Sequence, residues 1–161
     1  MGRTKPISIS ADYVVGLTDG EGCFYVNLRK CSRYQSGSVV QLHFHLKMQE
    51  ADKEVLYQVK NVLGCGNVYF QHENRPNHAQ CYRYTVASHR DILDKIIPFF
   101  GRHQLHTFSK RKNFLLFCKI AKIVESKKHL TSLGLVKIAR LKKLMNQRTL
   151  SIESPKDIGL A

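Results

Sequence analysis

Residues 14–22 carry the pattern in this chain that is best suited to chemistry. They read Val-Val-Gly-Leu-Thr-Asp-Gly-Glu-Gly, an apolar helical run that ends in two acids, each followed by glycine. The last carbonyls of a helix have no partners within the helix and carry partial negative charge. Glu21 at such an end is placed to share a divalent cation with those carbonyls, because hard cations prefer oxygen ligands. Taken alone, the same segment is more often a simple helix stop that leads into a hairpin.

Small residues form a stripe along the same expected helix. Asp12, Gly16 and Gly20 follow one another at a spacing of four and therefore share one face. Glycine inside a helix costs about 1 kcal/mol relative to alanine, so two on one face need a reason. Because glycine has no Cβ, another backbone can approach closely along this stripe.

The charge of the chain indicates the kind of partner. Lys and Arg number 26 against 12 Asp and Glu, which gives a net charge of +14 over 161 residues. A chain this basic favours a polyanion, and nucleic acid is the first candidate. No apolar stretch approaches the roughly 18 residues of a membrane span, and we expect neither a membrane partner nor a signal peptide. The expected location is intracellular, in a prokaryotic cytoplasm or an organelle.

Hydrophobic periodicity predicts a single α+β domain. A helix from residue 10 or 11 to the acid pair precedes two strands, a helix, two more strands and a helix, and further helices follow at the C-terminus. This order predicts an αββαββα unit whose four antiparallel strands have one face packed on helices. The expected strands are 23–30, 40–48, 68–71 and 82–87, and the later helices are 52–63, 91–100, 110–126 and 133–146. Residues 148–161 have no firm assignment.

The other face of the expected sheet is polar, aromatic and basic, and it includes no Asp or Glu. Such side chains match the phosphates and base edges of nucleic acid. An ordinary solvated face mixes acids with bases, so a DNA-binding face is favoured. With Arg33 of the first turn region, the predicted contacts are Tyr25, Asn27, Arg29, Arg33, Gln41, His43, His45, Lys47, Tyr69, Gln71, Arg83 and Thr85.

Residues 14–24 resemble the signature of the LAGLIDADG homing endonucleases. Gly16, Leu17, Asp19 and Gly22 coincide with motif letters, and Glu21 stands at the final acid. Further blocks resemble the family in the same order, at 44–68, 110–119 and 129–146, so that the resemblance covers about residues 10–147. Departures occur at positions 15 and 18, where valine and threonine replace the alanine and isoleucine of the motif.

The resemblance implies a site-specific double-strand DNA endonuclease that uses Mg²⁺ or Mn²⁺. In this family two motif helices pack at a two-fold axis, and the final acid of each binds metal. Carried over, Glu21 is a metal ligand, and the carbonyl of Gly20 is a second. A chain with one motif is then expected to act as a homodimer on a long pseudo-palindromic DNA site. The helix face at the dimer axis would comprise Val14, Gly16, Leu17 and Gly20.

Two further active-site positions follow from the resemblance. The family's water-organising glutamine aligns at Met48 or its neighbour Gln49, and Gln49 is the candidate. The family's active-site lysine matches Lys110 best, although a solvated phosphate contact or a helix cap describes Lys110 equally well. An intron RNA maturase of the same fold stays open as an alternative function. A catalytically silent DNA-binding regulator is the other alternative, and the intact acid Glu21 argues against it.

Overall fold

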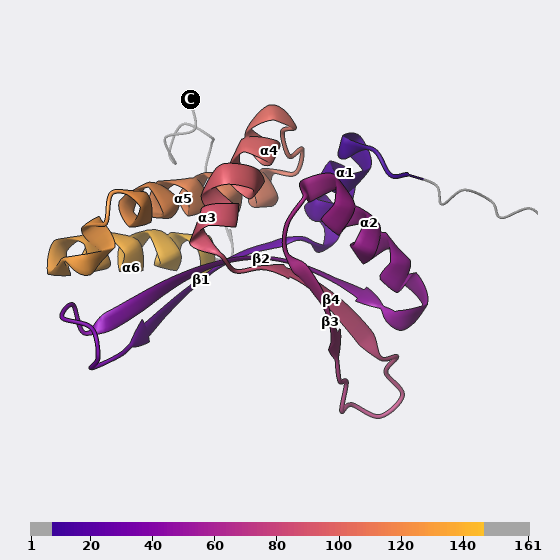
Figure 1. Ribbon diagram of the computed structural model, residues 1–161, viewed down its shortest axis with the longest axis horizontal. Coiled ribbons are helices and arrows are strands. Elements are labelled where there is room, and N and C mark those ends of the chain that lie inside the picture. Colours follow the sequence, from indigo (N-terminus) through magenta and orange to yellow (C-terminus); the bar gives the residue numbers. More distant parts are fainter. Residues whose placement is uncertain (1–7, 147–161) are drawn as a thin grey trace, which may run out of the picture. The chain divides into compact units, whose positions relative to one another are not determined.

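The computed structural model describes residues 8–146, and its strands form one four-stranded sheet in the order β1-β2-β4-β3 (Figure 1). Strand β4 pairs antiparallel with both β2 and β3. The α+β fold expected from the sequence is therefore confirmed. In chain order the elements are α1 (Ala11–Glu21), β1 (Cys23–Lys30), β2 (Ser38–Gln49), η1 (Glu50–Asp52), α2 (Lys53–Leu63), β3 (Asn67–Gln71), β4 (Cys81–Val86), α3 (His89–Asp91), η2 (Ile92–Ile96), α4 (Ile97–Arg102), α5 (Phe108–Glu125), η3 (Lys128–Leu130) and α6 (Ser132–Asn146).

The described chain divides into two compact units. The first unit comprises residues up to 25 together with 41–107, and it holds α1, α2, β3, β4 and the run from α3 to α4. The second comprises 26–40 and the chain from 108 onward, which is α5, α6 and one end of the β1–β2 hairpin. The segment 148–161 that sequence left without an assignment lies outside the described residues.

One face of the sheet supplies the core of the first unit. Phe44, Leu46 and Tyr84 are completely buried there, and α2 packs over β3 and β4. The ring of Phe44 lies 5.1 Å from the ring of Phe24 and 5.4 Å from that of Phe100 on α4. Aromatic pairs at such spacings add to the free energy of burial, so this cluster holds β1, β2 and α4 together.

The second unit is built around the packing of α5 on α6. Phe117 and Ile120 on α5 and Ile138 on α6 are completely buried, and Val26 and Val40 of the strands are nearly so. Among residues 8–146, no helix has both the length and the apolar content that crossing a membrane requires.

Most element boundaries differ from the sequence prediction by one or two residues, and two elements show how. Strand β2 runs from Ser38 to Gln49, longer at both ends than the predicted 40–48. The predicted helix 91–100 is a longer helical run, from 89 to 102, that contains a π-helical turn at Ile92–Ile96. Pro98 follows that turn and has no N–H for the carbonyl of residue 94, so the regular α-helical ladder cannot pass through it.

Gly22 makes the tight exit from α1 into β1 possible. Its N–H donates to the Thr18 carbonyl at 2.9 Å, while the backbone already turns extended at Gly22, with φ −73° and ψ 149°. A Cβ at this position would lie 2.7 Å from the Thr18 carbonyl oxygen and 2.9 Å from the Thr18 Cα. Those backbone atoms cannot move aside, because Thr18 is completely buried. Glycine is therefore required next to Glu21.

Replacing Gly22 by alanine should destabilise the protein. The added methyl group overpacks the turn, and overpacking costs about 1–3 kcal/mol in free energy of unfolding. Urea denaturation followed by circular dichroism measures the change. Gly101→Ala is the matched control, because a Cβ there meets nothing within 4 Å. A Gly22→Ala protein as stable as the control would contradict the packing argument.

Candidate functional site

The two acids at the end of α1 have different surroundings. The Asp19 carboxylate accepts hydrogen bonds from the backbone N–H of His106 at 2.9 Å and of Thr107 at 3.0 Å, and from the Thr107 hydroxyl at 3.0 Å. Burial acts to raise the pKa of Asp19, but the hydrogen bonds from His106 and Thr107 outweigh it and hold that pKa below its ordinary value. Asp19 is therefore an ionised structural acid whose oxygens are engaged within the protomer.

Glu21 is the exposed acid of the pair. It is the last residue of α1, and both it and Gly20 are exposed to solvent. Its carboxylate thus stands at the helix end where the final carbonyls lack intrahelical partners. A carboxylate beside backbone carbonyls is an oxygen donor set that suits Mg²⁺ or Mn²⁺. Across residues 8–146, no three His, Cys, Asp or Glu side chains converge on one point, so these donors form only part of a ligand set.

The glycine stripe of α1 is open. A Cβ built at Gly16 or Gly20 meets nothing within 4 Å, and Asp12 on the same stripe is exposed. Leu17 is half-buried. Val14 corrects the predicted helix face: its side chain is completely buried, so it belongs to the protomer core and has no surface left for a partner.

The polar face of the sheet in the first unit is arranged in cross-strand rows. Its members alternate with buried residues over 40–46 of β2 and 83–86 of β4, as the period of two requires, whereas β3 contains no buried residue. Strand β2 contributes His45, Lys47 and Gln49, which stand opposite Thr85, Arg83 and Cys81 of β4; Tyr69 and Gln71 of β3 stand opposite Arg83 and Cys81. The predicted contacts Gln41 and His43 lie further along β2, and Gln49, the candidate glutamine, is exposed at the end of that strand.

Histidine and tyrosine side chains form a cluster on this face. The His43 and His45 rings stack at 5.4 Å, and the Tyr25 ring lies 5.9 Å from that of His43. Burial, with the positive charges of Arg83 and His43, lowers the pKa of His45 to about 4. Burial likewise lowers the pKa of His43. This part of the face therefore offers neutral hydrogen-bonding groups at pH 7.

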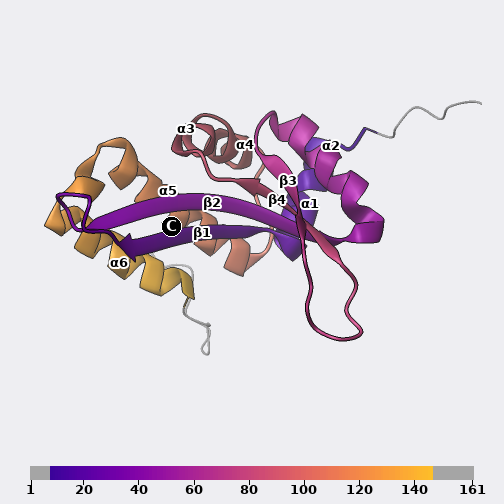
Figure 2. The same cartoon turned by 60° about the horizontal axis from the view of Figure 1, so that its bottom comes forward.

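The four strands contain no Asp or Glu, as expected, but an acid from outside the strands, Glu73, lies beside the polar face. It lies in the loop between β3 and β4, and its carboxylate is 3.9 Å from the Lys47 ammonium and 2.7 Å from the Arg75 guanidinium. In Figure 2 this loop extends beyond the strand ends, away from α2. Glu73 falls between the predicted strands 68–71 and 82–87, where no alternation of buried and exposed residues could assign it to a face. Neither Glu73 nor Arg75 was among the predicted site residues.

The remaining predicted residues lie in the second unit. Asn27 and Arg29 are on β1, and Arg33 is in the connection to β2; both arginines are exposed. That connection is a closed turn in which the Cys31 N–H donates to the Gly37 carbonyl at 2.9 Å. Lys110 lies in the first turn of α5 and is half-buried. Glu21 and Gln49 belong to the first unit, so a catalytic role for Lys110 stays a prediction.

Known proteins resemble this chain in sequence. The family model described as LAGLIDADG endonuclease matches residues 14–121. A probable intron-encoded endonuclease 2 of Neurospora crassa is 28% identical over 138 residues, which are 86% of this chain and 29% of that protein. Probable intron-encoded endonuclease 3 of the same species is 33% identical over 132 residues, 81% of this chain and 24% of that protein. The chain thus spans less than a third of these relatives.

Solved structures resemble it in fold. The homing endonuclease I-TnaI is 31% identical with a TM-score of 0.77, and the match covers 95% of each chain. I-SmaMI bound to an uncleaved DNA target in the presence of calcium ions is 32% identical with a TM-score of 0.80. That match covers 94% of this chain and 49% of I-SmaMI.

The low pKa of His45 predicts a pH dependence of stability. An unfolded histidine binds a proton near pH 6.5 but His45 in the fold does so only near 4. Between these values the unfolded chain holds more protons, so the free energy of unfolding should fall as the pH drops from about 6.5 to about 4. Nuclear magnetic resonance of the ring protons measures the pKa directly. The fall in stability should be shallower for His45→Gln, and a His45 that titrates at 6.5 or above would contradict the assignment.

Proposed function

This chain belongs to the LAGLIDADG endonuclease family, and on that premise we propose that it is a site-specific endonuclease that hydrolyses both strands of duplex DNA with a divalent metal. The observation that carries the proposal is that the two acids at the end of α1 have different surroundings. Asp19 is bound to the backbone before α5, whereas Glu21 is exposed beside the last helix carbonyls. Of the two, Glu21 is the acid available to a metal.

Glu21 and the Gly20 carbonyl would hold Mg²⁺ or Mn²⁺. When bound, such an ion supplies an activated water and a positive charge beside the leaving oxygen. Gln49, exposed at the end of β2, would orient the attacking water by hydrogen bonds from its amide. Lys110 would place a positive charge near the scissile phosphate, where the transition state gains negative charge.

Two copies of the motif helix would complete the site. We propose a homodimer in which the open stripe of Gly16 and Gly20 packs against the same stripe of a second chain, with Leu17 beside it. A self-complementary contact of this kind has two-fold symmetry, which fits a pseudo-palindromic DNA site. It brings two copies of Glu21 to one axis and so doubles the acids available.

The polar face of the sheet would bind the DNA. Lys47 and Arg83 supply positive charge for phosphates, while Tyr25, Gln71 and the neutral histidines supply hydrogen bonds and stacking surface for bases. In the second unit, Asn27, Arg29 and Arg33 extend the same chemistry. No observation on the described residues favours the RNA maturase alternative or the silent regulator, and neither is proposed.

Changing Glu21 to glutamine should abolish cleavage without weakening the fold. Glutamine keeps the size of the side chain but loses the charge that anchors a hard cation. We expect cleavage of a selected duplex in Mg²⁺ to fall below detection, while binding of the same duplex in Ca²⁺ persists. Glu54→Gln, an exposed acid on α2, is the matched control and should cleave like the unmodified chain.

Changing Asp19 to asparagine tests whether Asp19 has a structural role that differs from the metal-binding role proposed for Glu21. It weakens the hydrogen bonds to residues 106 and 107 and should lower the free energy of unfolding by about 1–2 kcal/mol, whereas Glu21→Gln should leave it unchanged. Chemical denaturation compares the two variants. Wild-type cleavage by Glu21→Gln would exclude Glu21 as the essential ligand.

Gly20→Leu should weaken dimerisation while the protomer stays folded. The protomer leaves open space at this position, so the leucine side chain would clash only with a partner helix, at a cost of about 1–3 kcal/mol or more. Analytical ultracentrifugation with and without DNA measures the dissociation. Gly101→Leu, at an equally open glycine on α4, is the control. A monomer that binds and cuts both strands of its site would rule out the homodimer.

A further inference from the structure

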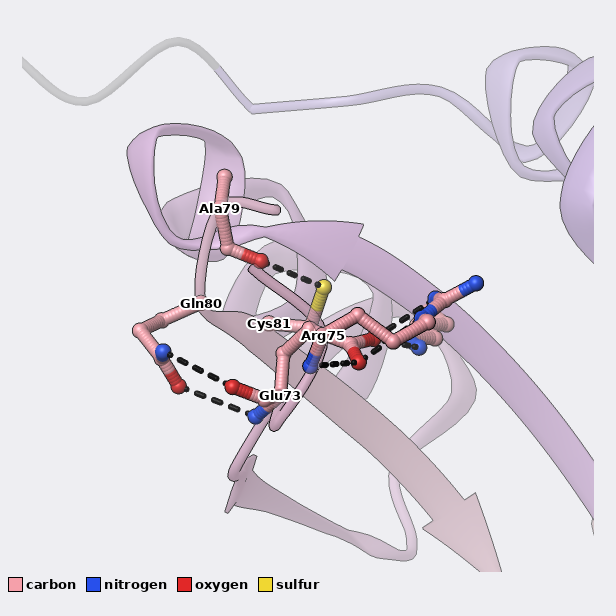
Figure 3. Close-up of polar contacts among 6 residues, drawn as sticks. Glu73, Arg75, Ala79, Gln80 and Cys81 are labelled. Atoms are coloured by element: carbon pink, nitrogen blue, oxygen red, sulfur yellow. Dashed lines mark hydrogen bonds and ion pairs between the residues drawn. The ribbon is translucent and has the colours of Figure 1, made fainter. Parts of the chain in front are cut away.

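Glu73 holds the side chain of Arg75 in one position (Figure 3). Its carboxylate accepts from the Arg75 Nε at 2.8 Å and from Nη2 at 2.7 Å, which is a parallel two-point contact. The backbone N–H of Arg75 donates to the same carboxylate at 3.1 Å. These hydrogen bonds lower the pKa of Glu73 to about 2, so its carboxylate is ionised at neutral pH.

The loop that carries this pair is itself braced. The Gln80 side chain accepts from the Glu73 N–H at 3.0 Å and donates to the Glu73 carbonyl at 3.3 Å, closing the base of the loop (Figure 3). Beyond Arg75 the chain turns through Pro76 and Asn77, which has a positive φ of 62°, and the His78 N–H returns to the Arg75 carbonyl at 3.4 Å. Proline followed by a residue with positive φ fits a type II turn. Arg75 therefore starts from a fixed backbone.

The exposure of the two side chains differs. The Glu73 side chain is 12% exposed and that of Arg75 is 65% exposed. Glu73 occupies the Nε and one Nη2 proton of a planar group that has five N–H donors, so the Nη1 edge faces away from it. The loop therefore presents to solvent the remaining N–H donors of Arg75 in a fixed direction, and the Glu73 carboxylate behind them is mostly buried.

We propose that Arg75 reads a guanine in the major groove of the DNA target and that Glu73 is the positioning residue that aims it. This inference rests on the proposed function. The outer edge of an arginine matches the O6 and N7 acceptors of guanine, which is the most frequent specific contact in protein–DNA complexes. Because Glu73 already restrains the arginine, less side-chain entropy is lost on binding.

The presence of Glu73 favours a contact of Arg75 with a nucleobase over a contact with a phosphate. A phosphate contact gains affinity from net positive charge, and Glu73 cancels the charge of Arg75 at 2.7 Å. Hydrogen bonds to a base edge need aimed donors and not net charge. Glu73 also lies 3.9 Å from Lys47 on the polar face of the sheet, so the pair borders the surface that would bind DNA.

The test is selection of bound duplexes from a randomised library in Ca²⁺, with the whole chain and its variants. The unmodified chain should prefer guanine at one position of each half-site. In Arg75→Ala that preference should fall by roughly 5- to 150-fold, the range for one two-point contact, while other positions keep theirs. Asn74→Ala, an exposed neighbour in the same loop, is the control and should select the same site.

Glu73→Gln gives the sharper result. It should lose the guanine preference, and its non-specific binding should become more salt-dependent by about one unit of slope, because the released guanidinium can then pair with a phosphate. Retained preference in this variant would overturn the positioning role. Arg75→Ala that weakens all duplexes equally and flattens the salt slope would show a phosphate contact instead. An unmodified chain that binds no duplex would overturn the proposed function itself.

Discussion

The contact of Asp19 with the backbone of residues 106 and 107 determines which acid at the end of α1 stays exposed to solvent. An ionised carboxylate that receives two N–H groups and a hydroxyl ties the first helix to the turn immediately before α5, 87 residues later in the chain. With Asp19 so engaged and Gly22 leaving the helix at once, Glu21 stands exposed at the helix terminus. Two acids that look alike in sequence thus differ in the structure: Asp19 is a structural acid, and Glu21 is the exposed acid that we propose as the metal ligand.

The net charge of +14 does not mean that the sheet face is positively charged throughout. Burial lowers the pKa of both histidines at its centre, with Arg83 adding to the effect on His45, and Arg75 at its border is paired with an acid. Only part of the basic surface is therefore equipped for phosphates. The rest offers hydrogen-bond donors and acceptors without net charge, which is what discrimination among base pairs requires.

Most of the fold could be predicted from hydrophobic periodicity, because strands and helices with one buried face leave a period that sequence displays. Strand β1 was predicted to the residue, and Gly64 closes α2 in the left-handed conformation that glycine favours. Val14 was misplaced, since an apolar residue on a helix does not reveal which neighbour covers it. Glu73 and Arg75 were missed because their arrangement depends on a turn and a side-chain clamp, which have no periodicity.

In the loop between β3 and β4, the contacts that hold the backbone do not involve the side chain that we propose to contact DNA. Gln80 closes it through the main chain of Glu73, and the turn beyond Arg75 is set by Pro76 and Asn77. None of these backbone hydrogen bonds uses the Arg75 side chain. The residues at 74, 75 and 78 can therefore change identity while the loop keeps its path. Natural selection for new target sites, or a library built to redirect the protein, can then vary what the loop recognises without altering the rest of the domain.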